Sequence, residues 1–227
     1  MVKIDSSDYH DYVIKDGRLV GEFDQMYKNA TDVPWHQDSQ KDWLDVKIAC
    51  DLLKGYAPFD YICDFGCGLG YYVDIIRRNV KSDNCKTTGY DVSPTCCKKA
   101  KVLFPDIEFK TIDLTMTPTC NDGVGRGNQL QASRRLFLIR GTLWYVSKNM
   151  PNVVANIASL THLDDKLLIV QNFPPLRSTF VGKDSIPDSE AIVSWFDKYF
   201  EPLETIWINN YVIQGNNNWF IGIFRRK

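Results

Sequence analysis

The chain has 227 residues, of which 44% are hydrophobic and 24% are charged, and its formal net charge is -1. This length suits one domain with a complete hydrophobic core, and the composition is that of an ordinary globular protein. A net charge near zero gives no long-range attraction to nucleic acids or anionic membranes, so we expect neither as a partner. No apolar run is long enough to span a bilayer, and the N-terminus has no apolar signal core.

Seven cysteines are spread along the chain without any C-x-x-C pair. The odd count and the spacing argue against a disulfide framework and against a zinc site, and we predict no bound metal. We interpret the cysteines as reduced side chains of a cytoplasmic protein, most of them packed as small apolar groups.

Residues 1–37 are polar and rich in aromatic side chains. An amphipathic helix is predicted from about Asp38, because apolar residues then recur at helical spacing until Gly55. Strands and helices alternate afterwards. Strands are predicted at 59–63, 86–91, 107–112, 136–140 and 166–173, helices at 70–80, 94–103, 151–161 and 189–200, and an antiparallel hairpin at 203–214 and 219–227.

This alternation predicts an α/β protein: a single Rossmann-like domain with a seven-stranded, mostly parallel sheet, helices on both faces and a C-terminal antiparallel hairpin. We divide the chain into an N-terminal cap segment, residues 1–37, and a ligand-binding domain, residues 38–227. Sheets of this kind bind ligands beyond the carboxyl ends of their strands, so candidate site residues are those that follow each strand.

A glycine-rich loop follows the first of these strands. The strand ends at Asp64, and Gly66-Cys67-Gly68-Leu69-Gly70 leads into a helix. Glycine lets the backbone approach a ligand closely, and a helix start presents free N–H groups. The spacing is G-x-G-x-G, whereas a dinucleotide site requires G-x-G-x-x-G, with a glycine where this chain has Tyr71. The next strand ends in Asp91, where an acid can bind ribose hydroxyls.

Three short segments resemble motifs of class I S-adenosylmethionine-dependent methyltransferases. The stretch CDFGCGLG, residues 63–70, is similar to the first motif, D-x-G-x-G-x-G; TTGYDVSP, residues 87–94, resembles the second and KTIDL, residues 110–114, the third. The resemblance implies S-adenosylmethionine as cofactor and S-adenosylhomocysteine as product. The residues that it assigns to the cofactor are the loop with its supporting acid, the ribose-binding acid and the adenine side: Asp64, Gly66, Cys67, Gly68, Gly70, Asp91, Val92, Asp113 and Leu114.

Two upstream stretches carry further likenesses. FDQMYKNATDVPWHQD, residues 23–38, resembles a Y…D-P-W segment of nodulation N-methyltransferases and sugar-modifying enzymes, although Val33 here separates Asp32 from Pro34. DYHDYVIKDGRLVGEF, residues 8–23, is similar to methyltransferases encoded with surface-polysaccharide genes. These likenesses imply a small polar acceptor, such as a sugar or a glycan-linked or phosphorylated metabolite of polysaccharide biosynthesis, methylated on O or N.

The chain departs from the family pattern around the fourth strand. Arg140 and Gly141 stand where such enzymes often carry an acid, so no carboxylate base is expected there. The nucleic-acid methylation motif N/D-P-P-Y/F is also missing from this position. Residues 117–135 are polar and glycine-rich, and they form either a mobile loop near the adenine side or a plain surface insertion.

Without that carboxylate, the candidates for a catalytic base are His10, His36 and Tyr145, together with Tyr9. Tyr27 and Trp35 are predicted to wall the methyl site. Arg140, counted among the cofactor-site residues, is predicted to hold an anionic group of the acceptor, because its planar fork suits phosphate or carboxylate.

Two other interpretations stay open. The chain could bind the cofactor or a partner protein without turnover, since the acid after the fourth strand is missing. It could also be an NAD-dependent oxidoreductase, which the glycine spacing and Tyr71 disfavour. The sequence does not name the acceptor or the oligomeric state.

Overall fold

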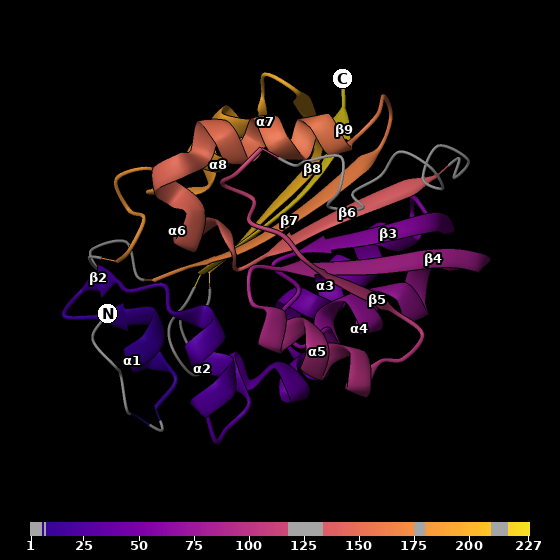
Figure 1. Ribbon diagram of the computed structural model, residues 1–227. Coiled ribbons are helices and arrows are strands. Elements are labelled where there is room, and N and C mark those ends of the chain that lie inside the picture. The colour runs from indigo at the N-terminus through magenta and orange to yellow at the C-terminus, as the bar shows by residue number, and fades with distance from the viewer. Residues whose placement is uncertain (1–5, 7, 118–133, 175–179, 210–217) are drawn as a thin grey trace.

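The computed structural model describes residues 6, 8–117, 134–174, 180–209 and 218–227. A seven-stranded sheet has the order β5-β4-β3-β6-β7-β9-β8 (Figure 1). Neighbours from β5 to β7 are parallel, and β9 pairs antiparallel with both β7 and β8. The predicted fold class is therefore confirmed. The strands are β3 (Phe59–Phe65), β4 (Lys81–Asp91), β5 (Glu108–Thr111), β6 (Arg135–Arg140), β7 (Lys166–Phe173), β8 (Phe200–Ile208) and β9 (Asn218–Arg226).

Helices cover both faces of the sheet. One face carries α3 (Leu44–Lys54), α4 (Tyr71–Val80) and α5 (Pro94–Leu103), and the other carries α7 (Met150–Leu160) and α8 (Ser189–Phe196), as Figure 1 shows. Pro94 at the first turn of α5 suits a helix start, because the missing N–H has no partner there in any case. Ser93 caps the same helix by accepting the N–H of Cys96.

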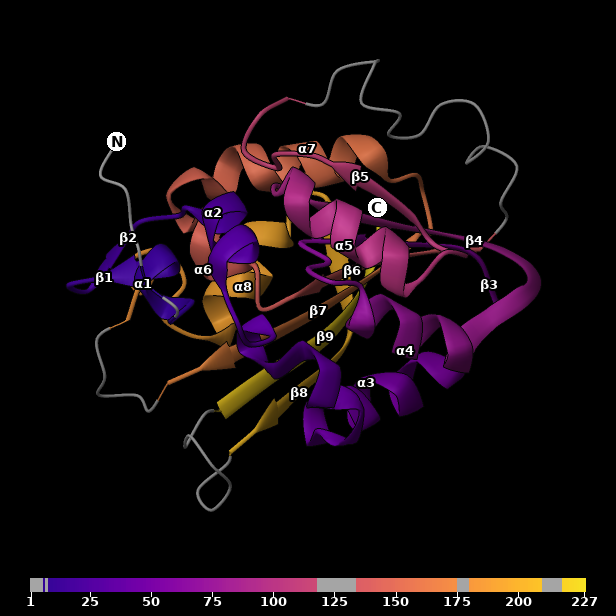
Figure 2. The same ribbon diagram turned by 60° about the horizontal axis from the view of Figure 1, so that its bottom comes forward.

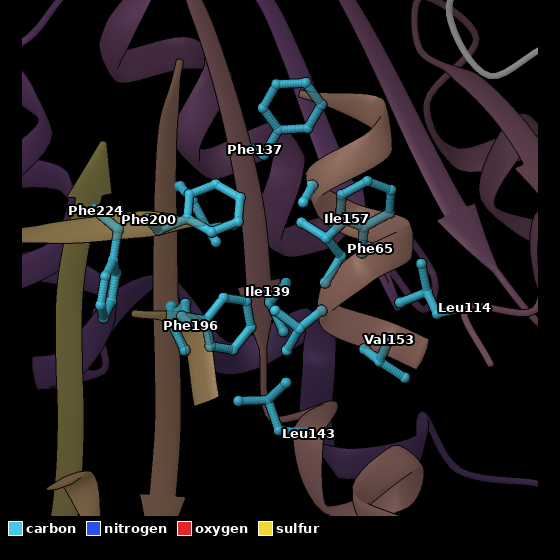
Figure 3. Close-up of a cluster of buried hydrophobic side chains, with 14 of the residues drawn as sticks. Phe65, Leu114, Phe137, Ile139, Leu143, Val153, Ile157, Phe196, Phe200 and Phe224 are labelled. Carbon is cyan, nitrogen blue, oxygen red and sulfur yellow. The ribbon is translucent and has the colours of Figure 1, made fainter. Parts of the chain in front are cut away.

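Alternation along the central strands divides the core into two layers. Phe137 and Ile139 of β6 pack with α7 and α8, whereas Leu136 and Leu138 pack with α3 and α4. Figure 3 shows the first layer. A strand covered on both faces must be apolar at every position, and each fully buried large side chain contributes about 1.5–3 kcal/mol of transfer free energy. The central strands are thus packed on both faces, and their carboxyl ends form the edge of the sheet that carries the site.

The N-terminal segment contains α1 (His10–Val13), β1 (Ile14–Lys15), β2 (Arg18–Leu19) and α2 (Phe23–Asn29), and a 3-10 segment η1 (Pro34–Asp42) follows. Figures 1 and 2 show α1 and α2 at one end of the sheet, near the start of α5. Asp24 accepts hydrogen bonds there from the Ser93 hydroxyl and the Thr95 N–H. The segment thus packs against the edge where the parallel strands end.

Some predicted boundaries were wrong. The helix expected from Asp38 begins at Leu44, because residues 34–42 form η1, with left-handed backbone at Trp35 and His36. The sequence also did not predict α6 (Leu143–Val146) or the 3-10 turn η3 (Ser147–Asn149), which are too short to show a period. Of the predicted loop 117–135, residues 118–133 lie outside the described residues, and so do residues 210–217 at the hairpin turn.

Candidate active site

A cavity of about 620 Å³ lies at the carboxyl ends of the parallel strands. This volume is in the range of cavities that enclose small organic ligands, about 300–1,000 Å³. Its wall combines the residues after β3, β4, β5 and β6 with side chains of the N-terminal segment and of η1. The edge that the sequence predicted for a site therefore carries a cavity.

The conformation of the loop after β3 requires glycine at two positions. Gly66 and Gly68 have φ values of 75° and 55°, a region that other residues rarely adopt. A Cβ atom on Gly66 would lie 2.3 Å from Thr142 Oγ1, and one on Gly68 would lie 2.4 Å from Gln37 Oε1. The loop therefore has no room for a side chain at either position, and its bare backbone borders the cavity.

Asp91 ties the end of β4 to this loop. Its Oδ2 accepts the N–H of Gly68 at 3.0 Å, and its Oδ1 accepts the N–H of Ser93 at 2.9 Å. Burial raises the pKa of Asp91, and the N–H donors of Ser93 and Gly68 oppose that rise. Each carboxylate oxygen keeps a further lone pair for a ligand on the cavity wall.

Asp64, like Tyr72 and Trp144, carries a buried polar atom on the cavity wall that has no hydrogen-bond partner among the described residues. Its side chain is buried, and among the described residues its Oδ1 has no hydrogen-bond partner. Burial raises the pKa of Asp64 to about 8; the charge of Arg140 lowers it, and that of Asp91 raises it further. A buried carboxyl group without a partner is unfavourable when ionised, so this position favours a cationic or hydrogen-bond-donating ligand.

Arg140 at the end of β6 already has partners within the protein. Its Nε and Nη2 donate to Asp45 Oδ2 at 2.9 and 2.8 Å, and its Nη1 donates to Gln40 Oε1 at 2.6 Å. The guanidinium also lies 5.0–5.6 Å from the ring centroids of Trp43, Tyr72 and Trp219. The predicted role as a free anion-binding group does not fit this geometry, because Asp45 neutralises the charge. Asp45 itself lies on α3, outside the cavity lining, and so does not replace the carboxylate that the sequence lacks after β6.

Gln40 connects this ion pair to a strained turn. Its Nε2 donates to the carbonyl oxygen of Trp35 at 2.8 Å, and Trp35 and His36 have φ values of 53° and 51°. Two successive residues other than glycine in the left-handed region cost free energy, and such strain is typical of functional sites. The chain of contacts Asp45–Arg140–Gln40 therefore holds Trp35 and His36 at the cavity wall.

Gln37 fastens the same turn to the glycine loop. Its Oε1 accepts the N–H of Leu69 at 2.8 Å, and its Nε2 donates to the Tyr27 hydroxyl at 3.2 Å. Burial raises the pKa of Tyr27 well above its ordinary value, which keeps this hydroxyl protonated. The N-terminal segment is thus bonded directly to the backbone of the loop.

Aromatic rings form one side of the cavity. Trp35 lies 5.6 Å from Tyr9, 6.3 Å from Tyr27 and 6.0 Å from Tyr145, measured between ring centroids. Phe23 lies 5.3 Å from Tyr145. All five residues border the cavity. The structure therefore brings the predicted Tyr27, Trp35 and Tyr145 together with two rings of the N-terminal segment.

The four candidate bases are placed differently. Tyr9 borders the cavity, but burial raises the pKa of its hydroxyl, which makes it a poor base near neutral pH. His36 borders the cavity. The side chain of His10 is 67% exposed, its Nδ1 lies 2.8 Å from Asp8 Oδ1, and it is outside the cavity lining, so its position does not favour the predicted catalytic role. Burial raises the pKa of Tyr145 to about 12, so near neutral pH its hydroxyl stays protonated and is a poor base. His36 is therefore the candidate that the geometry favours.

Of the remaining predicted residues, Cys67, Val92, Asp113 and Leu114 border the cavity. Gly70 is outside the cavity lining and precedes the first residue of α4. Asp113 Oδ1 accepts the N–H and the hydroxyl of Thr115, at 2.8 and 2.7 Å. Burial raises the pKa of the Cys67 thiol well above its ordinary value, which makes it unreactive. Sequence reasoning missed several residues of the wall because they follow no motif: Gln37, Gln40, Trp43, Tyr72, Thr142, Asn172 and Trp219.

Within the described ranges, no group of three or more His, Cys, Asp and Glu side chains is arranged to hold a metal ion. In the same part of the chain, no helix has the length and apolar character that crossing a membrane requires.

No family model and no curated protein matches this chain. Several solved structures are similar to this chain in fold. The N-methyltransferase NodS from Bradyrhizobium japonicum WM9, in complex with S-adenosyl-L-homocysteine, is 14% identical, with a TM-score of 0.67 over 89% of this chain and 97% of that one. A TehB-like SAM-dependent methyltransferase from Corynebacterium glutamicum is 17% identical, with a TM-score of 0.55 over 86% and 100%.

The fold is also shared by proteins with other descriptions. A geranyl diphosphate methyltransferase in complex with GPP and sinefungin is 13% identical, with a TM-score of 0.56 over 80% of this chain and 77% of that one. The [4+2]-cyclase SpnF is 12% identical, with a TM-score of 0.55 over 80% and 81%. At these identities the likeness concerns the fold: this chain has the Rossmann-like fold of S-adenosylmethionine-dependent methyltransferases.

Proposed function

We propose that this protein transfers a methyl group from S-adenosylmethionine to an O or N atom of a small-molecule acceptor. The observation that carries the proposal is the combination of two glycines in the loop, Gly66 and Gly68, with two buried carboxyl groups, Asp64 and Asp91, on one cavity wall. S-adenosylmethionine carries two cationic groups, a sulfonium and an ammonium, beside one carboxylate, so carboxyl partners and a closely approaching backbone favour its binding.

The residues present fit this cofactor. The free Oδ1 of Asp64 is an acceptor for the cofactor's ammonium group, and Asp91 has lone pairs for two ribose hydroxyls. Charge-assisted hydrogen bonds of this kind contribute about 1.5–3 kcal/mol each. Val92, Asp113 and Leu114 would border the adenine ring.

Bound S-adenosylmethionine supplies a methyl group that is already activated by its sulfonium sulfur. The protein then mainly has to align the acceptor, an effect of up to about 7–11 kcal/mol in ideal cases. His36 at the cavity wall would take a proton from the acceptor, and a general base of this kind typically contributes about 10²–10⁴-fold. Trp35 would wall the methyl site beside it.

The N-terminal segment, residues 1–37, would act as a cap on the domain formed by residues 38–227. Its described part supplies Tyr9, Phe23 and Tyr27 to the cavity wall and is bonded to the rest through Asp24 and Gln37. Such a cap would exclude water from the methyl donor. The polysaccharide-linked acceptor implied by the sequence stays a prediction, and so does a cytoplasmic location.

Titration calorimetry tests the proposal. The full chain should bind S-adenosylmethionine and S-adenosylhomocysteine and should not bind NAD. Asp91→Asn should weaken binding at least about tenfold, because a neutral amide cannot accept from two ribose hydroxyls as a carboxylate does. Asp106→Asn, at an exposed position outside the cavity lining, is the matched control. Binding of NAD without binding of S-adenosylmethionine would overturn the proposal.

A second candidate is cofactor binding without methyl transfer. One solved structure with this fold is a [4+2]-cyclase, so the fold alone does not fix the reaction. Product analysis for S-adenosylhomocysteine, with a panel of amine and hydroxyl acceptors, separates the two. Tight cofactor binding with no product from any acceptor would favour the second candidate.

A further inference from the structure

Among the described residues of the cavity wall, acidic side chains outnumber basic ones. Three carboxyl groups border the cavity, those of Asp64, Asp91 and Asp113, against one guanidinium, that of Arg140. The Arg140 side chain is 11% exposed and is paired with Asp45, whose side chain is 2% exposed. Among the described lining residues, no unpaired lysine or arginine therefore faces an acceptor. A phosphate or carboxylate group of an acceptor would therefore find no free cationic partner there, which disfavours its binding.

The acceptor side of the cavity is aromatic. The rings follow one another along the wall in the order Tyr9, Trp35, Tyr145 and Phe23, with successive ring centroids 5.3–6.0 Å apart. The negative face of an aromatic ring attracts a cation, by about 0.5–1 kcal/mol at exposed sites and about 2 kcal/mol when the cation is desolvated. A wall of such rings thus attracts an ammonium group and packs against an apolar body.

We propose that the acceptor is a primary or secondary amine with an apolar or aromatic body, recognised in its protonated form by the rings of Tyr9, Phe23, Trp35 and Tyr145. This inference rests on the proposed methyl transfer and names the substrate class of the same site. It replaces the expectation of a phosphorylated acceptor.

The reaction balances as a methylation of nitrogen. The ammonium group gives a proton to His36, and the nitrogen lone pair then forms a bond to the methyl carbon. The carbon–sulfur bond breaks, and its electron pair stays on sulfur as the thioether of S-adenosylhomocysteine. The methylated amine leaves as an ammonium ion, and His36 returns its proton to water.

Three probes of similar size test the inference: phenethylamine, 2-phenylethanol and 3-phenylpropionate. Calorimetry on the full chain saturated with S-adenosylhomocysteine measures binding without turnover. We expect the amine to bind at least about tenfold more tightly than the alcohol, and the carboxylate to bind more weakly than either. The preference for the amine should shrink as salt is added, because charge attraction is screened.

Matched variants locate the effect. Phe23→Leu removes a ring face and should reduce the amine preference about threefold or more, whereas Phe23→Tyr keeps the ring and should leave it unchanged. Trp35→Leu should act in the same direction as Phe23→Leu. Trp35 has a left-handed backbone, so the thermal denaturation midpoint serves as the check that each variant is folded.

Equal binding of the three probes, tightest binding of the carboxylate, or no binding of any probe would overturn the inference. Repeating the titrations without S-adenosylhomocysteine separates it from the proposed function. If the protein binds no S-adenosylhomocysteine, the proposed function is wrong. The inference is then judged by the amine preference measured without S-adenosylhomocysteine.

Discussion

Each end of β6 carries an ion pair between an arginine and an aspartate, and the two pairs have different roles. At the amino end, Arg135 pairs with Asp165, and both side chains are buried away from the cavity. At the carboxyl end, Arg140 pairs with Asp45 and borders the cavity. A buried ion pair is weak evidence for net stability. We infer that the position of each pair decides what it does: Arg135 fixes the strand, whereas Arg140 shapes the site.

The largest expected effect is at the amino end. Asp165→Ala leaves the buried Arg135 guanidinium uncompensated and should lower the free energy of unfolding by about 3–5 kcal/mol. Urea denaturation measures this. Asp60→Ala, which breaks the more exposed pair with Arg134, should cost about 1 kcal/mol or less. If both variants cost the same, burial does not distinguish the two pairs.

At the carboxyl end we expect loss of binding rather than loss of stability. Asp91→Ala should weaken S-adenosylhomocysteine binding by at least about tenfold, because ribose loses its carboxylate partner. Asp91→Asn keeps an acceptor for the Gly68 or Ser93 N–H and shows how much of the effect is structural. Affinity comes from calorimetry and folding from the denaturation midpoint. Unchanged affinity in both variants would contradict the site.

Asp64 should make cofactor binding depend on pH. Its pKa of about 8 means that the carboxyl group is mostly protonated at neutral pH in the free protein. An ammonium ligand needs the ionised form, so affinity should rise with pH, by up to about tenfold per unit, and level off above about pH 8. Asp64→Asn should remove the slope. Calorimetry from about pH 6 to pH 9 measures it, and an equal slope in the variant would contradict the assignment.

The same shift has a consequence for stability. The pKa of Asp64 in the folded state is raised above its ordinary value of 3.8, so between about pH 4 and pH 8 the folded chain binds more protons than the unfolded chain. The stability of the ligand-free protein should therefore decrease as pH rises through this window. Asp64→Asn should weaken this decrease, and thermal unfolding at several pH values measures it.

The smallest effect concerns the contact between Arg140 and the strained turn. Gln40→Leu breaks the bonds to Arg140 and to the Trp35 carbonyl and should lower kcat several-fold, with cofactor affinity within about twofold. Gln40→Glu keeps an acceptor for Arg140 but loses the donor to Trp35, so it should lower kcat to a similar degree. Wild-type turnover in Gln40→Glu would show that the Trp35 bond does not position the site.

Local patterns in the sequence determined the scaffold. The sequence predicted the apolar strands β3, β6 and β7 and the loop Gly66–Gly70. Short apolar runs, their alternation with helices, and glycines that adopt a left-handed backbone all depend on neighbours in the chain. The same holds for Asp64 and Asp91, which lie at the carboxyl ends of their strands, one residue before the last in β3 and at the last residue of β4. Parallel strands end at one edge, so the place of the cavity followed from the fold class.

Tertiary structure alone decided which groups meet in the site. Arg140 pairs with Asp45, 95 positions away, and Gln40 and Gln37 reach β6 and the loop from a segment that was expected to be partly helical. No period or motif encodes such contacts, because they depend on how separate elements pack. The raised pKa of Asp64, the neutralised charge of Arg140 and the exposed position of His10 arise in the same way, since burial and pairing are properties of the folded chain.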